Sequence, residues 1–386
     1  TNQAYGPGGL GVIAVSGVPG LQPARARLLP LAQKLATSLT EDQRRELEDP
    51  ASRFNFGWSH GKEFLSDGRA DVRKGSFYAN PLLPEGKESP LDGAIEGGRD
   101  AAAAAALTRF PGVCRPNVWP RDPAVLSDLR PAFREAGRIL ADVAVAVAGA
   151  CDAMLAAKQR REAAEAAGME TRGGGGGGND GDGSANKEAT TKTKAAPTLR
   201  SLIESGDAAK GRLLYYYPPG QRSTSACGGG DDAKERGGGA AAEDDTAAPS
   251  TSGERREEDH RNEEEREEED GWCGWHVDSG ALTALVRAMF LDPRGNEVED
   301  PGPGSGAGLY VRPRRGWRHR RRSSSTCGGG GGGGGEVEQE ASADGGDDDD
   351  YGQRAPAVRV SIPEGCVAVQ AGEAAQVFSG GSIVAT

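Results

Sequence analysis

The chain has 386 residues and a formal net charge of −12, a balance that does not favour a general nucleic-acid-binding protein. Its 60 glycines and much of its acidic charge lie in biased runs that cannot bury a core, so the folded part is considerably shorter than the chain. None of the six cysteines forms a Cys-x-x-Cys pair. This argues against a zinc ribbon or a disulfide framework and favours an intracellular, cytoplasmic location.

The first 170 residues predict an N-terminal region made mainly of helices. Residues 10–20 are a β-rich run closed by glycine and proline, which indicates a strand and a turn. Residues 24–39 carry apolar side chains at helical spacing, and Pro30 either breaks this helix or starts a new one. Thr40, followed three residues later by Gln43, predicts the N-cap of a further short helix.

A long helix is predicted from residue 126 to about residue 167, where alanine is frequent and apolar residues recur three and four apart. Pro131 is tolerated because it falls in the first turn. The most apolar stretch, residues 139–155, contains Asp142 and Asp152. We therefore expect a buried helix of a soluble domain and no membrane span.

The second half of the chain alternates between ordered islands and biased stretches. Residues 171–197 predict a low-complexity linker, and the stretches at about 220–270 and 317–355 predict disordered inserts in loops. The last island, residues 357–386, predicts a set of short strands. The apolar pairs expected in its final strands, and the expected turns, are Val377-Phe378, Ile383-Val384, Gly365 and Gly372.

Two of the four histidines, His260 and His319, lie in charged runs and are expected to be solvated. His276 is more informative because Asp278 follows two residues later, and residues two apart in a strand project from the same face. One imidazole and one carboxylate are two parts of the 2-His-1-carboxylate triad that binds Fe(II) in non-haem oxygenases. The competing interpretation is a polar pair at a strand end. A zinc site that includes Cys273 is disfavoured because no second Cys/His pair has suitable spacing.

Several segments resemble the isopenicillin N synthase-like 2-oxoglutarate/Fe(II)-dependent dioxygenase superfamily. Residues 276–285 resemble its metal strand, with His-x-Asp followed after three residues by Leu-Thr-x-Leu. Residues 211–218, Gly-Arg-Leu-Leu-Tyr-Tyr-Tyr-Pro, resemble the strand that precedes the metal strand. Residues 5–13 resemble the start of the N-terminal region, and residues 55–63 and 74–81 resemble a plant and algal branch. The resemblance covers nearly all the ordered segments.

The resemblance implies an α+β fold, in which an N-terminal helical region, residues 1–170, packs on a double-stranded β-helix (jelly-roll) barrel, residues 198–386. It implies Fe(II) as the metal, with 2-oxoglutarate and O₂ as co-substrates. His276 and Asp278 would be the metal ligands, and Tyr217 would contact 2-oxoglutarate. Tyr215 stands where relatives often have asparagine, which weakens that last assignment. Residues expected either to line the substrate approach or to pack the N-terminal region on the barrel are Trp58, His60, Phe77, Tyr78 and Asn80.

The family also has a second histidine ligand and an Arg-x-Ser pair near the end of its barrel. Residues 372–386 resemble the strand that leads into that histidine. We therefore expect a barrel that is incomplete at the C-terminus and a fragment that lacks the third ligand and is inactive alone. The start at Thr1 rather than Met likewise leads us to expect residues upstream, where a targeting peptide would lie.

Other functions stay open at this point. An iron oxidase of the same fold need not use 2-oxoglutarate, and a non-catalytic interaction protein could use the acidic and glycine runs themselves. Nucleic-acid binding by the basic residues 312–322, with Trp317 as a stacking platform, is less favoured because acidic tracts follow them. The expected partner is an unknown small-molecule substrate, with no nucleic acid and no membrane.

Overall fold

The computed structural model describes residues 1–64, 68–92, 100–121, 127–173, 197–218, 273, 275–302, 305–313, 339–340 and 357–386. The expected linker at 171–197 and the expected inserts at about 220–270 and 317–355 lie almost entirely outside the described residues. The described part combines helices with small antiparallel sheets. It shows no closed barrel, so the double-stranded β-helix stays a prediction.

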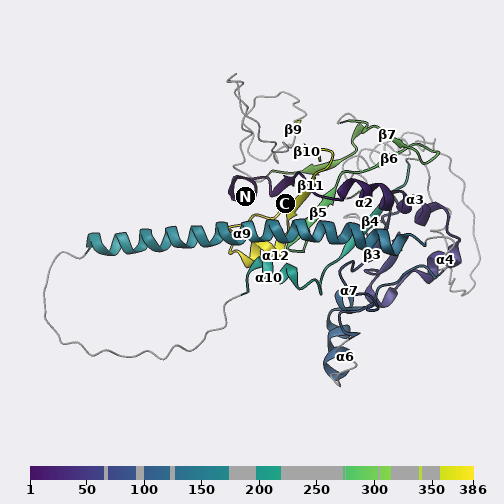
Figure 1. Cartoon of the computed structure of the whole chain (residues 1–386), viewed down its shortest axis with the longest axis horizontal. Helices are drawn as coiled ribbons and strands as arrows, with labels where there is room; N and C mark the ends of the chain where they lie inside the picture. The colour runs from purple at the N-terminus through teal and green to yellow at the C-terminus, as the bar shows by residue number, and fades with distance from the viewer. Residues whose placement is uncertain are drawn as a thin grey trace, which may run out of the picture.

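Helix α9 (Leu129–Gly173) is the central element and crosses most of the molecule (Figure 1). Its predicted position is confirmed, with Pro131 in the first turn. Leu129 and Phe133 pack in one core cluster, while Val147 and Cys151 pack in a second. One face of α9 therefore joins two cores. By length and composition its residues 129–166 are also apolar enough to cross a membrane.

The sheet β1-β11-β5 packs on the middle of α9 and unites the two ends of the chain (Figure 1). Strand β11 (Val367–Ala371) lies between β1 (Val12–Val15) and β5 (Leu282–Val286), and both pairings are antiparallel. The buried side chains Val367 and Val369 face α9 in the second core cluster. The start of the chain is thus built into the same sheet as its end.

The sheet β2-β3-β4 packs on the first turns of α9 and has two chemically different faces. It consists of β2 (Gly57–His60), β3 (Lys74–Ala79) and β4 (Gly211–Tyr216). Phe77 pairs with Leu213, and both lie in the first core cluster. Because side chains alternate along a strand, the neighbouring pair Tyr78 and Arg212 lies on the opposite face.

The start of the chain folds as its local signals predict. Pro30 begins helix α3 (Pro30–Thr37) directly after α2 (Leu21–Leu28), so it separates two helices. Thr40 caps α4 (Glu41–Glu46) in a reciprocal capping box with Gln43.

The end of the chain departs from prediction. Val377 and Phe378 were expected in a strand, but they end helix α12 (Glu373–Phe378). Gly372 is the N-cap of that helix rather than a turn residue, whereas Gly365 forms the predicted turn with a positive φ. Ile383 and Val384 lie outside any strand but are buried. The apolar pairs signalled burial correctly, and the assignment to strands was wrong because burial alone does not distinguish a short strand from a short helix.

The remaining elements are smaller. Strand β10 (Val358–Val360) lies between β8 (Leu309–Val311) and β9 (Gln339–Glu340), and β6 (Phe290–Leu291) pairs with β7 (Glu297–Val298). The other short helices are α1 (Asn2–Tyr5), η1 (Pro50–Ser52), α6 (Asp100–Arg109), α7 (Pro111–Cys114) and α10 (Leu199–Glu204).

Candidate functional site

The structure brings His276 and Asp278 together, as their spacing predicts. Nε2 of His276 lies 3.4 Å from Oδ1 of Asp278, and both side chains are partly exposed. The two residues lie in a loop before β5 rather than in the strand from which the spacing argument started, and their side chains are in contact there.

The carboxylate of Asp278 is held in place by its neighbours. Its Oδ2 accepts a hydrogen bond of 2.5 Å from the hydroxyl of Thr283 on β5, and its backbone carbonyl accepts one of 2.8 Å from the amide of Glu373. The hydrogen bond with His276 lowers the pKa of Asp278, and the bond with Thr283 lowers it further against the opposing effect of burial. The group is therefore an ionised, oriented carboxylate at neutral pH.

Cys273 lies at the start of the same loop. Its Sγ is 3.6 Å from Nζ of Lys74 on β3. Burial alone would raise the pKa of this thiol, but the hydrogen bond with His276 and the positive charges of Lys74 and Arg212 lower it. A thiol, an imidazole and a carboxylate thus lie within six positions of the chain.

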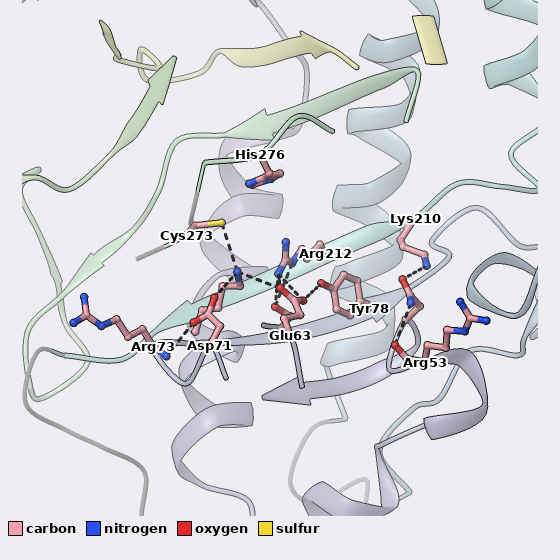
Figure 2. A network of polar contacts seen from close by, with 12 residues as sticks. Arg53, Glu63, Asp71, Arg73, Tyr78, Lys210, Arg212, Cys273 and His276 are labelled. Atoms are coloured by element: carbon pink, nitrogen blue, oxygen red, sulfur yellow. Dashed lines mark hydrogen bonds and ion pairs between the residues drawn. The ribbon is translucent and has the colours of Figure 1, made fainter. Parts of the chain in front are cut away.

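Beneath this loop, the polar face of the β2-β3-β4 sheet carries a cluster of charged side chains (Figure 2). Nζ of Lys74 lies 2.6 Å from Oδ2 of Asp71 and 3.1 Å from Oε2 of Glu63. Nη2 of Arg212 donates to Oε1 of Glu63 at 3.0 Å, and the phenol of Tyr78 donates to the same oxygen at 2.7 Å. Two cations therefore balance two carboxylates.

The charge cluster keeps Glu63 ionised. Burial alone would raise the pKa of Glu63, but Arg212, Tyr78 and Lys74 outweigh it and lower that pKa. The cluster lines a shallow polar depression together with neighbouring groups. The residues that border this depression are Ser59, Gly61, Glu63, Asp71, Lys74 and Ser76.

Tyr217, the predicted contact of 2-oxoglutarate, lies on the other side of this sheet. It belongs to the first core cluster, where its ring packs 4.8 Å from the ring of His60 and 5.1 Å from that of Tyr215. Its hydroxyl is buried without a hydrogen-bond partner among the described residues, and burial raises its pKa to about 12. The structure therefore does not bring Tyr217 together with His276 and Asp278.

The other residues expected near a substrate approach divide between two roles. Trp58 and Phe77 are buried in the first core cluster, and Nε2 of His60 contacts the carbonyl of Val72 at 3.0 Å. Asn80 is buried and its amide donates to the carbonyl of Gly206 at 3.0 Å. These contacts are structural packing. Tyr78 is different because it lies on the polar face beside Glu63.

Sequence reasoning did not single out Glu63, Lys74 and Arg212 as site residues. The polar face of the sheet was indicated by residues 74–79, Lys-Gly-Ser-Phe-Tyr-Ala, in which polar and apolar side chains alternate in part. The signal for its partners was absent, because Arg212 bonds to Ser76 across 136 positions of the chain. Local pattern carries no information on that pairing.

The donor atoms present fit a divalent metal in part. Ligands about 2.1 Å from an ion in adjacent coordination positions lie roughly 3 Å apart, so the separation of 3.4 Å between His276 and Asp278 needs only a small adjustment. Within the part of the chain that the structure describes, however, no three His, Cys, Asp or Glu side chains are grouped to hold a metal ion. The described residues thus offer two ligands rather than a complete triad.

No protein-family model, no curated protein and no solved structure matches this chain. What this chain does is therefore inferred from the geometry of its own residues.

Proposed function

We propose that this chain is part of an Fe(II)/2-oxoglutarate-dependent oxygenase, in which His276 and Asp278 are two of the protein ligands of the iron. The observation that carries the proposal is the contact of 3.4 Å between the imidazole and the carboxylate. The hydrogen bond from Thr283 supports it, because metal-binding carboxylates are usually oriented by a second group.

The position of the C-terminal segment also supports the proposal. The amide of Gly372 donates to the carbonyl of Ala281 at 3.0 Å, and the amide of Glu373 donates to the carbonyl of Asp278 at 2.8 Å. Residues 372–386 are the ones that resemble the strand before the second histidine ligand of the family. Residues 373–378 form helix α12 rather than that strand, so the support is limited to the contact of the first residues of the segment with Asp278 and Ala281.

Bound Fe(II), with 2-oxoglutarate and O₂, would supply oxidation of a C–H bond in a small-molecule substrate. The roles of this chain's own residues follow from their contacts. His276 and Asp278 would bind the metal, and Thr283 orients the carboxylate of Asp278. The charge cluster, with Lys74 on β3 and Arg212 on β4, lies under the loop and supports it. Tyr217, the predicted contact of 2-oxoglutarate, lies apart from these residues, with its ring packed on His60 in the first core cluster.

The second candidate is a non-catalytic protein on the same fold. It is favoured by one observation, that only two candidate ligands converge among the described residues. The two candidates differ in what happens to 2-oxoglutarate, since only the oxygenase converts it to succinate.

Metal titration of the 386-residue chain tests the proposal. We expect Co(II), used as an air-stable probe for Fe(II), to bind the wild type, and His276→Ala or Asp278→Ala to weaken binding at least tenfold. Glu162→Ala is the matched control, because this carboxylate lies on the exposed part of α9. Equal Co(II) affinity in the wild type and both site variants would overturn the assignment of the ligands. Succinate formation from 2-oxoglutarate and Fe(II) by a longer chain that supplies the third ligand then distinguishes the oxygenase from the non-catalytic candidate, because the 386-residue chain alone is expected to be inactive under both.

A further inference from the structure

The ligand loop, residues 273–278, is anchored to the body of the protein by side chains from several elements. At its end, Asp278 bonds to Thr283 and to the amide of Glu373. In its middle, the guanidinium of Arg312 stacks 4.1 Å from the ring centroid of Trp275. At its start, Sγ of Cys273 lies 3.6 Å from Nζ of Lys74.

The anchor at Lys74 is the most buried of these side-chain anchors. The side chain of Lys74 is only 8% exposed, and Asp71, its ion-pair partner at 2.6 Å, is 3% exposed. Glu63 holds the same ammonium at 3.1 Å and is itself fixed by Arg212 and Tyr78. Two carboxylates fix the position of this ammonium, so its contact with Cys273 fixes the position of the start of the loop.

The anchor also acts close to the proposed ligands. Cys273 precedes His276 by three residues and hydrogen-bonds to its side chain. Residues 275–278 lie before β5 and outside any strand ladder, so side-chain contacts decide where they lie. A shift of Cys273 would therefore change the distance between His276 and Asp278.

We propose that Lys74 is a positioning residue for the ligand loop, and that it acts through its contact with Cys273 to hold His276 beside Asp278. This inference rests on the proposed function in one respect, the consequence for metal affinity. The ordering of the loop itself does not depend on any metal.

Two variants break the contact from opposite sides. Cys273→Ala removes the thiol with little effect on the core. Asp71→Asn combined with Lys74→Met removes the ion pair as a unit, which avoids leaving one buried charge without its partner. The matched controls are Cys114→Ala, a half-buried thiol at the end of α7, and Glu48→Gln with Lys62→Met, a partly buried ion pair of 3.4 Å outside the charge cluster.

Hydrogen exchange of the metal-free protein, followed by mass spectrometry, gives the first readout. We expect amides of residues 275–281 to exchange at least several-fold faster in Cys273→Ala and in the Asp71/Lys74 double variant, and at the wild-type rate in both controls. Combining all three changes should add little to either variant alone, because they break the same contact. Unchanged exchange in Cys273→Ala would overturn the proposal. If the double variant does not fold, Cys273→Ala alone decides the outcome.

Co(II) affinity gives the second readout. We expect both variants to bind Co(II) about tenfold more weakly than the wild type, since loss of a supporting group typically costs tenfold or more. Faster exchange without any His276-dependent Co(II) binding in the wild type would leave the loop anchor standing and remove the proposed function. A thiolate-to-cobalt charge-transfer band in the wild type that disappears in Cys273→Ala would overturn the positioning role, because Cys273 would then be a ligand itself.

Discussion

The phenol of Tyr5 donates a hydrogen bond of 2.8 Å to the backbone carbonyl of Val369, which lies 364 positions later in the chain. Tyr5 is fully buried, and burial raises its pKa well above the ordinary value, so the phenol remains a protonated donor. The bond attaches the N-terminal turn to β11, the strand that also pairs with β5 after the ligand loop. The first residues of the chain thus stabilise the sheet that carries the proposed site.

Tyr5→Phe removes this hydrogen bond and nothing else. We expect the free energy of unfolding to fall by about 1–2 kcal/mol, because the carbonyl of Val369 loses a buried partner. Urea denaturation followed by tryptophan fluorescence measures the change. An unchanged midpoint would show that the bond contributes nothing net to stability.

Tyr217→Phe is expected to act in the opposite direction. The hydroxyl of Tyr217 is buried without a hydrogen-bond partner among the described residues, so its removal relieves a desolvation cost. We expect the free energy of unfolding to stay the same or to rise by up to about 1 kcal/mol, in the same urea assay. A loss of stability comparable with that of Tyr5→Phe would show that this hydroxyl has a partner in solution.

Part of this structure could be predicted from the sequence, namely the features that depend on neighbouring residues. Local signals with a short reach were sufficient for the capping box of Thr40 and for the helix start at Pro30, because each involves residues within one turn. The contact of His276 with Asp278 was predicted from their spacing of two, although the strand assumed for that prediction is a loop in the structure.

Features that depend on distant pairing were not accessible. Tyr217 was expected near the co-substrate, but the register of β3 with β4 places it on the apolar side of the sheet. The same register brings Arg212 to Glu63 and builds the charge cluster. Register is set by the packing of whole faces, and a local pattern does not reveal which strand will be the partner.

Gly75→Ala tests the packing of that sheet. A Cβ at Gly75 would overlap the ring of Trp58, which is 2% exposed and belongs to the neighbouring strand β2. We expect a loss of about 1–3 kcal/mol in the free energy of unfolding, typical of overpacking in a core. Gly8→Ala is the control, because a Cβ there meets no atom within 4 Å. Equal stability of the two variants in thermal unfolding would contradict the close packing of Trp58 on Gly75.

Glu63→Gln tests the charge cluster through its pH dependence. Because the folded-state pKa of Glu63 is lowered, its ionised form stabilises the fold above its ordinary pKa of 4.5, and this contribution is lost as pH falls through the folded-state pKa. At neutral pH we expect Glu63→Gln to be less stable than the wild type by about 1 kcal/mol, a modest value because the carboxylate is partly exposed. The difference should shrink below pH 4.5.

The measurement for Glu63→Gln is urea denaturation of both proteins across this pH range. Asp278 also has a lowered pKa and loses its contribution in acid, but it is present in both proteins and cancels in their difference. Glu162→Gln, on the exposed part of α9, is the control and should differ little from the wild type at every pH. A difference between Glu63→Gln and the wild type that stays constant from neutral pH into acid would contradict an ionised Glu63 in the cluster, because a structural loss alone does not titrate.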